Sequence, residues 1–142
     1  MLKIELMPWE RARAEASRIR TLVFVEEQQV PNELEMDQHD VHCIHALAFI
    51  GGDAIGTARL LPDGHIGRMA VLKPWRGKGV GSAILARLVE AARDRGEHEV
   101  MLSAQTHALA FYRAHGFVEE GDEYLEAGIP HRAMRRRLGS EP

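Results

Sequence analysis

The sequence predicts an α/β fold of the α+β kind, in which helices pack on a mixed sheet. Two observations carry this prediction. Three apolar runs separated by turn residues follow one another in the first half of the chain, and the apolar period changes to that of a helix after Gly79. Because 142 residues make about one ordinary domain and no internal repeat divides them, we expect a single domain over residues 1–142.

The first half of the chain is expected to form a strand, a helix and an antiparallel meander. Residues 3–7 alternate as a strand, and Pro8 opens a stretch with apolar residues at helical spacing. The segment 28–40 is polar and contains Pro31, which indicates a loop. Three further strands, separated by turns suited to hairpins, are expected at residues 44–50, 54–61 and 65–72.

The second half alternates helices with strands. The helix after Gly79 has an apolar face and a charged face, and Gly96 stands where a C-terminal cap belongs. Thr106 is expected to cap a shorter helix that ends at Gly116. The remaining strands are expected at residues 100–103, from Phe117 onward, and at residues 131–138.

Charge and composition argue against nucleic acid and membrane partners. The chain has 18 Lys plus Arg against 21 Asp plus Glu, and neither half is basic. The run Arg135–Arg137 could bind phosphate, but near the end of an acidic chain a solvated strand end is favoured. No apolar stretch reaches the roughly 18 residues of a membrane span. We therefore expect a soluble protein.

Cysteine usage and the N-terminal stretch indicate a reducing, cytoplasmic setting. Cys43 is the single cysteine, so it has no partner for an internal disulfide. Its surroundings favour a small buried residue over a nucleophile. The first residues lack the long apolar core of a signal peptide.

The stretch GRMAVLKPWRGKGVGSAIL, residues 67–85, predicts an anion site between a strand and a helix. Its spacing fits neither a Walker loop nor a dinucleotide fingerprint. The free backbone N–H groups of Gly79 to Ser82 lie at a helix N-terminus, and Arg76 and Lys78 add positive charge. A plain strand-to-helix connector is the alternative. Phosphate is favoured because backbone can approach it closely where Cβ atoms are missing, at Gly77, Gly79 and Gly81.

Two motifs resemble those of the GNAT family of N-acetyltransferases. Arg76-x-x-Gly79-x-Gly81 matches the family signature Q/R-x-x-G-x-G/A, and AQTHALAFYRAHGF, residues 104–117, is similar to its second coenzyme A motif, with Gln105 where many members carry Asn. The resemblance implies the GNAT fold, with a largely antiparallel central sheet and a splayed central strand pair that holds acetyl-CoA. It implies cofactor contacts from Met69, Ala70, Val71, Arg76, Gly77, Lys78, Gly79, Val80, Gly81, Ser82, Gln105 and Tyr112.

Two further segments resemble a narrower group, the ElaA-like members of that family. They are VFVEEQQVP at residues 23–31 and EAGIPHRAM at residues 126–134. The resemblance implies direct transfer of an acetyl group to an amine acceptor. It assigns the backbone of residues 69–71 to polarising the thioester carbonyl.

The family motif places Tyr112 beside the departing thiolate. A phenol with a pKa near 10 can protonate a forming thiolate while it stays protonated at neutral pH. Taken alone, the pair Phe111–Tyr112 would be read as core packing. The matching motif favours the general acid.

The general base stays open between Glu27 and His131. Both residues, and Glu126, fall in the ElaA-like segments, which the family fold places near the acceptor. A carboxylate there could attract a cationic amine, and histidine suits proton transfer near neutral pH. The alternatives are a solvated helix-end charge for Glu27 and an ordering role in the loop for His131.

No metal is expected, and the function has alternatives. The histidines of residues 39–45 fit no common zinc spacing, and a hydrogen-bonded histidine at the start of a strand explains His45. The favoured reading is an acetyl-CoA-dependent N-acetyltransferase acting on a small-molecule amine. A coenzyme A-binding sensor without turnover, a protein N-acetyltransferase and a homodimeric state stay open.

Overall fold

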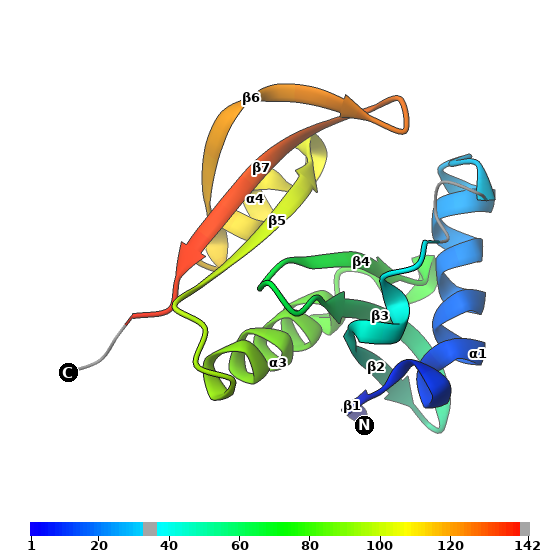
Figure 1. The fold of residues 1–142 in the computed structure, drawn as a ribbon. Coiled ribbons are helices and arrows are strands. Elements are labelled where there is room, and N and C mark those ends of the chain that lie inside the picture. The colour runs from blue at the N-terminus through cyan, green and yellow to red at the C-terminus, as the bar shows by residue number, and fades with distance from the viewer. Residues whose placement is uncertain (33–36, 140–142) are drawn as a thin grey trace.

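The computed structural model describes residues 1–32 and 37–139. Its strands form two antiparallel sheets (Figure 1). The first has the order β1-β2-β3-β4, with bounds Leu2–Met7, Ile44–Ile50, Asp53–Leu60 and Ile66–Val71. The second has the order β5-β7-β6, with bounds Glu99–Gln105, Ile129–Arg137 and Val118–Glu126. The predicted strands are thus present, and their ends agree with the predicted ends to within two residues.

The two sheets meet at one end and diverge at the other. A parallel bridge between His65 and Met101 joins them, and the Met101 amide donates to the Gly64 carbonyl at 3.1 Å. Beyond this bridge β4 has only β3 as a neighbour and β5 has only β7 within the two sheets. This confirms the mixed, largely antiparallel sheet with a splayed central strand pair.

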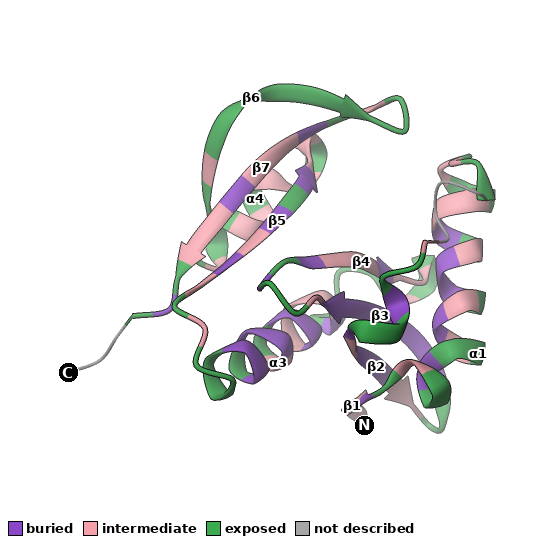
Figure 2. Cartoon of the chain, in the orientation of Figure 1, coloured by how far each residue is buried: buried purple, intermediate pink, exposed green. Residues whose placement is uncertain are grey.

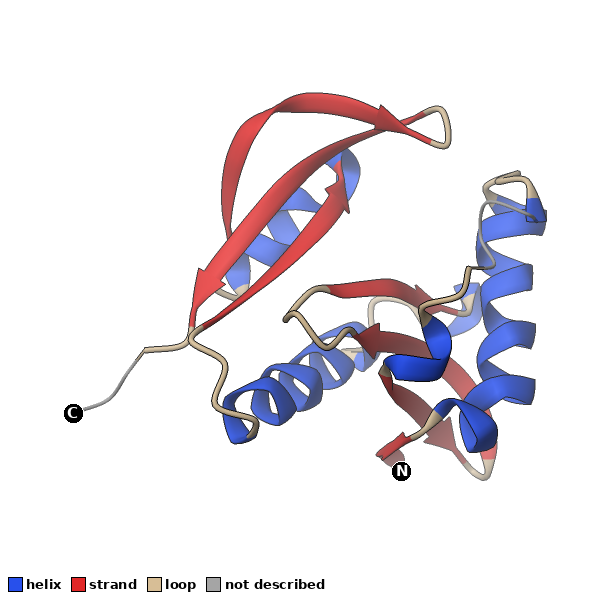
Figure 3. Cartoon of the chain, viewed as in Figure 1, coloured by secondary structure: helices blue, strands red, loops and turns tan. Residues whose placement is uncertain are grey.

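Helices cover both faces of the first sheet (Figure 3). Helix α1, Trp9–Arg20, continues into the π-helix η1, Thr21–Glu27, and α3 spans Val80–Asp94. Leu47 packs on the side of α1, while its neighbours on β2 pack on the side of α3. Alternation along β2 therefore buries both of its faces. Short helices lie at Asp40–His42 (η2), Lys73–Trp75 (η3), Thr106–Ala108 (η4) and Leu109–Ala114 (α4).

The sequence predicts a C-terminal cap at Gly96 and an N-terminal cap at Thr106, and only the first is present. Gly96 has φ 89°, and the amide of Glu97 donates to the carbonyl of Ala92 at 3.0 Å, so the predicted C-terminal cap is confirmed. The prediction that Thr106 caps a helix is wrong, because Thr106 lies inside η4 and α4 begins after Ala108 without a side-chain cap.

Arg135, the first residue of the arginine run near the end of β7, is ion-paired with both neighbouring strands. Arg135 contacts Glu99 on β5 and Glu120 on β6. These ion pairs favour the interpretation of the run as a solvated strand end over a phosphate-binding site. Within the described residues, no helix is long and apolar enough to span a membrane.

Candidate active site

A cavity of about 720 Å³ opens where β4 and β5 diverge. Its walls come from η1, β4, the glycine turn with the start of α3, the end of β5, α4 and the β6–β7 hairpin. The structure brings every predicted site residue except Lys78 to this cavity. They are Glu27, Met69, Ala70, Val71, Arg76, Gly77, Gly79, Val80, Gly81, Ser82, Gln105, Tyr112, Glu126 and His131.

The glycine turn points the N-terminus of α3 at the cavity. Gly79 is the N-cap residue in the left-handed region (φ 84°), and no side chain caps the helix. The first N–H groups of α3 consequently stay available to a bound anion. A Cβ at Gly81 would lie 3.4 Å from Cζ of Phe111 and 3.8 Å from the sulfur of Met69. Gly79 is therefore favoured by its backbone angle, whereas at Gly81 a single Cβ would make ordinary van der Waals contact with Phe111 and only a larger side chain would crowd it.

Arg76 and Glu27 form an ion pair across one side of the cavity. Both terminal nitrogens of Arg76 donate to the Glu27 carboxylate at 2.7 Å, and Nε donates to the Val71 carbonyl at 2.8 Å. The hydrogen bonds from Arg76 lower the pKa of Glu27. Glu27 is thus an ionised partner of the turn, a contact that the sequence analysis did not anticipate.

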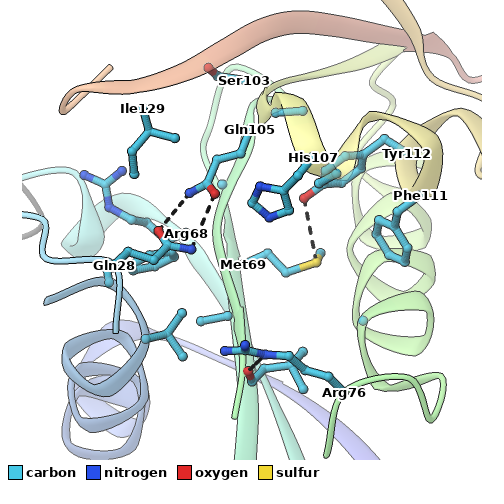
Figure 4. A pocket seen from close by; sticks show the side chains of 18 of the residues that line it. Gln28, Arg68, Met69, Arg76, Ser103, Gln105, His107, Phe111, Tyr112 and Ile129 are labelled. Atoms are coloured by element: carbon cyan, nitrogen blue, oxygen red, sulfur yellow. Dashed lines mark hydrogen bonds between the residues drawn. The ribbon is translucent and has the colours of Figure 1, made fainter. Parts of the chain in front are cut away.

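Tyr112 presents a buried hydroxyl to the cavity (Figure 4). Its Oη donates to the sulfur of Met69 at 3.9 Å, and its ring makes edge contacts with Phe111 and Phe117. Burial raises the pKa of Tyr112 to about 12. The phenol is therefore protonated throughout the neutral range and has a sulfur atom as its acceptor.

His131 is held in one tautomer by the β6–β7 hairpin. Its Nδ1 lies 2.7 Å from the Ile129 carbonyl oxygen. A carbonyl only accepts, so Nδ1 carries the proton and Nε2 keeps a lone pair. His131 is the register partner of Gln105 on β5 and of Tyr124 on β6, so the three side chains share one face. His131 is buried, and Nε2 is the ring nitrogen that the hydrogen bond at Nδ1 leaves free.

Glu126 lies on the exposed end of β6 at the same cavity wall. Ser103 Oγ donates to its Oε1 at 3.2 Å and also contacts Tyr124 Oη. This carboxylate is within reach of solvent. It can attract a cationic molecule to the cavity.

Sequence reasoning missed two residues of the cavity wall, Gln28 and Arg68. Gln28 exchanges hydrogen bonds with Gln105, which the sequence did predict for the site, and Arg68 adopts φ 53° on β4. Gln28 follows the pair Glu26–Glu27 in an ElaA-like segment, which was the available signal. Arg68 lies in a bulge, because Gly67 pairs with Arg59 while Ala70 pairs with Thr57. No local pattern announces that bulge.

A buried charge network supports the wall behind Arg68. Asp40 accepts from Arg20 at 2.9 and 3.1 Å and from Arg59 at 2.9 Å, and Asp37 accepts from Arg59 twice at 2.8 Å. Arg68 donates to Asp37 at 3.1 Å. The hydrogen bonds from Arg59 hold the pKa of Asp37 well below its usual range. The network links α1, η2 and β3 to the cavity strand β4.

The remaining sequence candidates take structural positions. His45 Nε2 lies 2.9 Å from the Asp40 carbonyl oxygen near the start of β2, as predicted, and burial lowers its pKa. Cys43 is buried, and burial raises its pKa to about 11. The described residues contain no group of three His, Cys, Asp or Glu side chains able to hold a metal ion.

Residues 13–138 match the acetyltransferase (GNAT) domain family. The chain belongs to this family. It is 39% identical over 131 residues to the uncharacterized N-acetyltransferase YjcF of Bacillus subtilis. The aligned region covers 89% of this chain and 94% of YjcF. Escherichia coli ElaA has a similar structure, with TM-score 0.84 and 28% identity, over 96% of this chain and 99% of that chain. An acyl-CoA N-acyltransferase from Pseudomonas aeruginosa is also similar in structure, with TM-score 0.85 and 33% identity, over 96% of this chain and 99% of that chain.

The predicted family and its fold are thereby confirmed. The GNAT chain is an acetyltransferase, and its family relationship supports an acyl-CoA donor and an N-acyltransferase reaction.

Proposed function

We propose that this GNAT protein transfers the acetyl group of acetyl-CoA directly to a small-molecule amine. The observation that carries the proposal is the composition of one cavity. An uncapped helix N-terminus, the open edge of β4 and a buried phenol all line it. Phosphate, an extended amide-containing arm and a departing thiolate are the three parts of acetyl-CoA that these features suit.

The donor's pyrophosphate is assigned to the turn at residues 76–82. Backbone N–H groups at the start of α3 and the dipole of a 15-residue helix favour a negative charge there. Lys78 lies in this turn outside the cavity lining, so we assign it long-range attraction only. The backbone of Met69, Ala70 and Val71 is assigned to the arm and to the thioester carbonyl, because β4 has an open edge at this point.

Tyr112 is assigned as the general acid. The amine nitrogen bonds to the carbonyl carbon, the carbon–sulfur bond breaks, and the sulfur takes the phenolic proton. Burial keeps that proton in place until the thiolate forms, since the pKa of Tyr112 is raised to about 12. The hydroxyl already donates to a sulfur atom, that of Met69, so its position suits a second sulfur nearby.

His131 is assigned as the base that takes the proton from the attacking amine. The hydrogen bond at Nδ1 leaves Nε2 as the nitrogen free to accept a proton. Glu27 is the weaker candidate, because its ion pair with Arg76 lowers its pKa and its affinity for a proton. We assign Glu27 to holding Arg76 beside the turn, and Glu126 to attracting a cationic acceptor.

Thiol release from acetyl-CoA tests the proposal. Single amines of different classes, and peptides with free N-termini or lysines, are offered at saturating donor. Release with a small amine, and an acetylated product by mass spectrometry, is the expected result. Release with peptides alone would make the chain a protein N-acetyltransferase. Acetyl-CoA binding without release for any acceptor would indicate a sensor and overturn the proposal.

A further inference from the structure

Gln28 and Gln105, called here the amide pair, meet across the cavity (Figure 4). Gln105 Nε2 donates to Gln28 Oε1 at 2.9 Å, and Gln28 Nε2 donates to Gln105 Oε1 at 3.4 Å. The two residues are 77 positions apart and come from opposite halves of the chain. Their contact joins the end of η1 to the end of β5.

Both partners are placed by rigid neighbours. Glu27, directly before Gln28, accepts two hydrogen bonds from Arg76. Gln28 is the C-cap of the π-helix, and its backbone N–H donates to the Val23 carbonyl. Gln105 ends β5 opposite His131 on β7. The pair therefore lies beside the residue assigned as the base. A one-turn π-helix is a frequent feature of functional sites.

The amide pair keeps hydrogen-bonding capacity that its partners leave unused. A primary amide has two N–H donors and an oxygen with two lone pairs, and the reciprocal bonds use one donor and one lone pair on each side. Among the described residues, neither side chain has another hydrogen-bonding partner. Apolar neighbours in the cavity wall, Phe24 and Ile129, offer none. A ligand with N–H groups could satisfy both oxygens.

The chemistry of the nucleophile favours amides at this place. Only the neutral amine attacks a carbonyl, and a nearby carboxylate would stabilise the unreactive ammonium form. An amide oxygen accepts an N–H without that charge effect. We infer that the amide pair holds the acceptor nitrogen through the free lone pair of a side-chain oxygen, with the second N–H of the nitrogen toward His131 and the nitrogen lone pair toward the donor. This inference rests on the proposed function and makes the acceptor a primary amine.

Side-chain amide signals test the inference directly. In ¹⁵N-labelled protein saturated with coenzyme A, the signals of Gln28 and Gln105 are assigned by their loss in Gln28→Leu and Gln105→Leu. Butylamine, benzylamine, glycinamide and cadaverine are added singly up to about 100 mM, a range that detects millimolar binding. A saturable shift of both signals with at least one amine is expected. A shift of one signal alone, or of neither with all four, overturns the inference.

Kinetics separate positioning from a structural role. Gln28→Leu should raise the KM of that amine about tenfold, the loss of one hydrogen bond, with the dissociation constant of acetyl-CoA unchanged. Gln105→Glu should move the acidic limb of the kcat profile to higher pH, because a carboxylate raises the pKa of the bound amine. Gln38→Leu, the same change at an exposed site outside the cavity, should leave KM and the pH profile unchanged. An unmoved pH profile in Gln105→Glu would also contradict the inference.

The outcomes distinguish the two proposals. Thiol release by the wild-type protein without amide shifts would retain the transferase and reject the amide pair. Amide shifts without release for any of the four amines would retain the amide pair as an amine site and reject transfer to these acceptors.

Discussion

At the scale of single residues, burial and hydrogen bonding decide what each cavity side chain can do. Tyr112 and Tyr124 are the two tyrosines of the chain, yet only Tyr112 lines the cavity. Glu27 and Glu126 are both carboxylates, but Glu27 is bound to Arg76 while Glu126 is exposed. Residues of the same type therefore differ in what they can do, because their burial and hydrogen bonding differ.

Tyr112→Phe should lower kcat by about 10² to 10⁴ while acetyl-CoA still binds, because only the proton donor is lost. Since burial raises the pKa of Tyr112 to about 12, its ionisation should cause no fall in the wild-type rate up to about pH 10. Stopped-flow thiol release at saturating acetyl-CoA measures kcat, and calorimetry measures binding. Tyr124→Phe removes the other phenol and serves as the control. A loss below about threefold in Tyr112→Phe would reduce the residue to packing.

His131→Ala should lower kcat by at least about 10², with donor affinity nearly unchanged. Glu27→Gln should keep kcat within about threefold, because its role lies with Arg76. The rate of thiol release at saturating acetyl-CoA in both variants is the measurement. If Glu27→Gln shows the large loss and His131→Ala does not, the base is Glu27.

At the scale of elements, the glycine turn makes α3 an anion site. Gly81→Val should weaken acetyl-CoA binding by about 1 kcal/mol or more, the order of one helix-terminus anion interaction, since its methyl groups would crowd Phe111 and the cavity. Isothermal calorimetry measures the dissociation constant. Ala86→Val, on an exposed turn of α3, controls for the helix propensity of valine. Equal affinities in the two folded variants would mean that the turn holds another ligand.

Local patterns predicted the elements, and long-range contacts decided the rest of the site. The period of α3, the left-handed Gly96 and the uncapped turn at Gly79 depend on neighbouring residues, so the sequence was sufficient for them. The pairing of Glu27 with Arg76 joins positions 49 apart, and no spacing announces it. Thr106 failed as a cap because a 3₁₀ turn fits the tight exit from β5. Motif resemblance supplied the cavity residues that periodicity alone would have left as core.

At the scale of the whole molecule, the buried network of Arg20, Asp40, Arg59 and Asp37 ties the N-terminal helix to the central strands. Hydrogen bonds from the arginines outweigh burial and lower the pKa of Asp40. A lowered pKa in the folded state contributes stability above the unfolded value of about 4, and this stability is lost as the pH falls through the folded value. Burial lowers the pKa of His45 in the folded state. The free energy of unfolding therefore also decreases as the pH falls below about 6.5, the ordinary pKa of histidine.

Asp40→Asn should therefore lower the free energy of unfolding by about 3 to 5 kcal/mol at pH 7, because two buried guanidinium groups lose their shared carboxylate. Its stability should also depend less on pH below about pH 4 than that of the wild type. Urea unfolding at several pH values measures both effects. Asp53→Asn, at an exposed position on β3, is the matched control. A loss under about 1 kcal/mol would mean that the network is replaceable.

The outer strand β6 is exposed along almost its whole length and carries the sequence VEEGDEYLE (Figure 2). Its carboxylates oppose pairing with a second copy of the same edge. Replacing Asp122 and Glu123 by Asn and Gln should increase concentration-dependent association, measured by sedimentation velocity. Replacing Glu90 and Asp94 on α3 by Gln and Asn makes the same charge change on a helix and should not increase association. Equal behaviour of the two variants would show that total charge, not the edge, controls association.

The strand order β5-β7-β6 also sets a sequence of events in time. In the first sheet, β2, β3 and β4 form consecutive hairpins, so the contacts between these three strands are local and can form early. In the second sheet the central strand is the last one in the chain, and β5 and β6 have no contact as neighbours until it inserts between them. During synthesis, then, the first sheet can fold while the cavity is still missing one wall. A chain released before β7 would lack His131 and would leave β5, with Gln105 at its end, without its neighbour in the second sheet, so the acetyltransferase becomes competent only when β7 is in place.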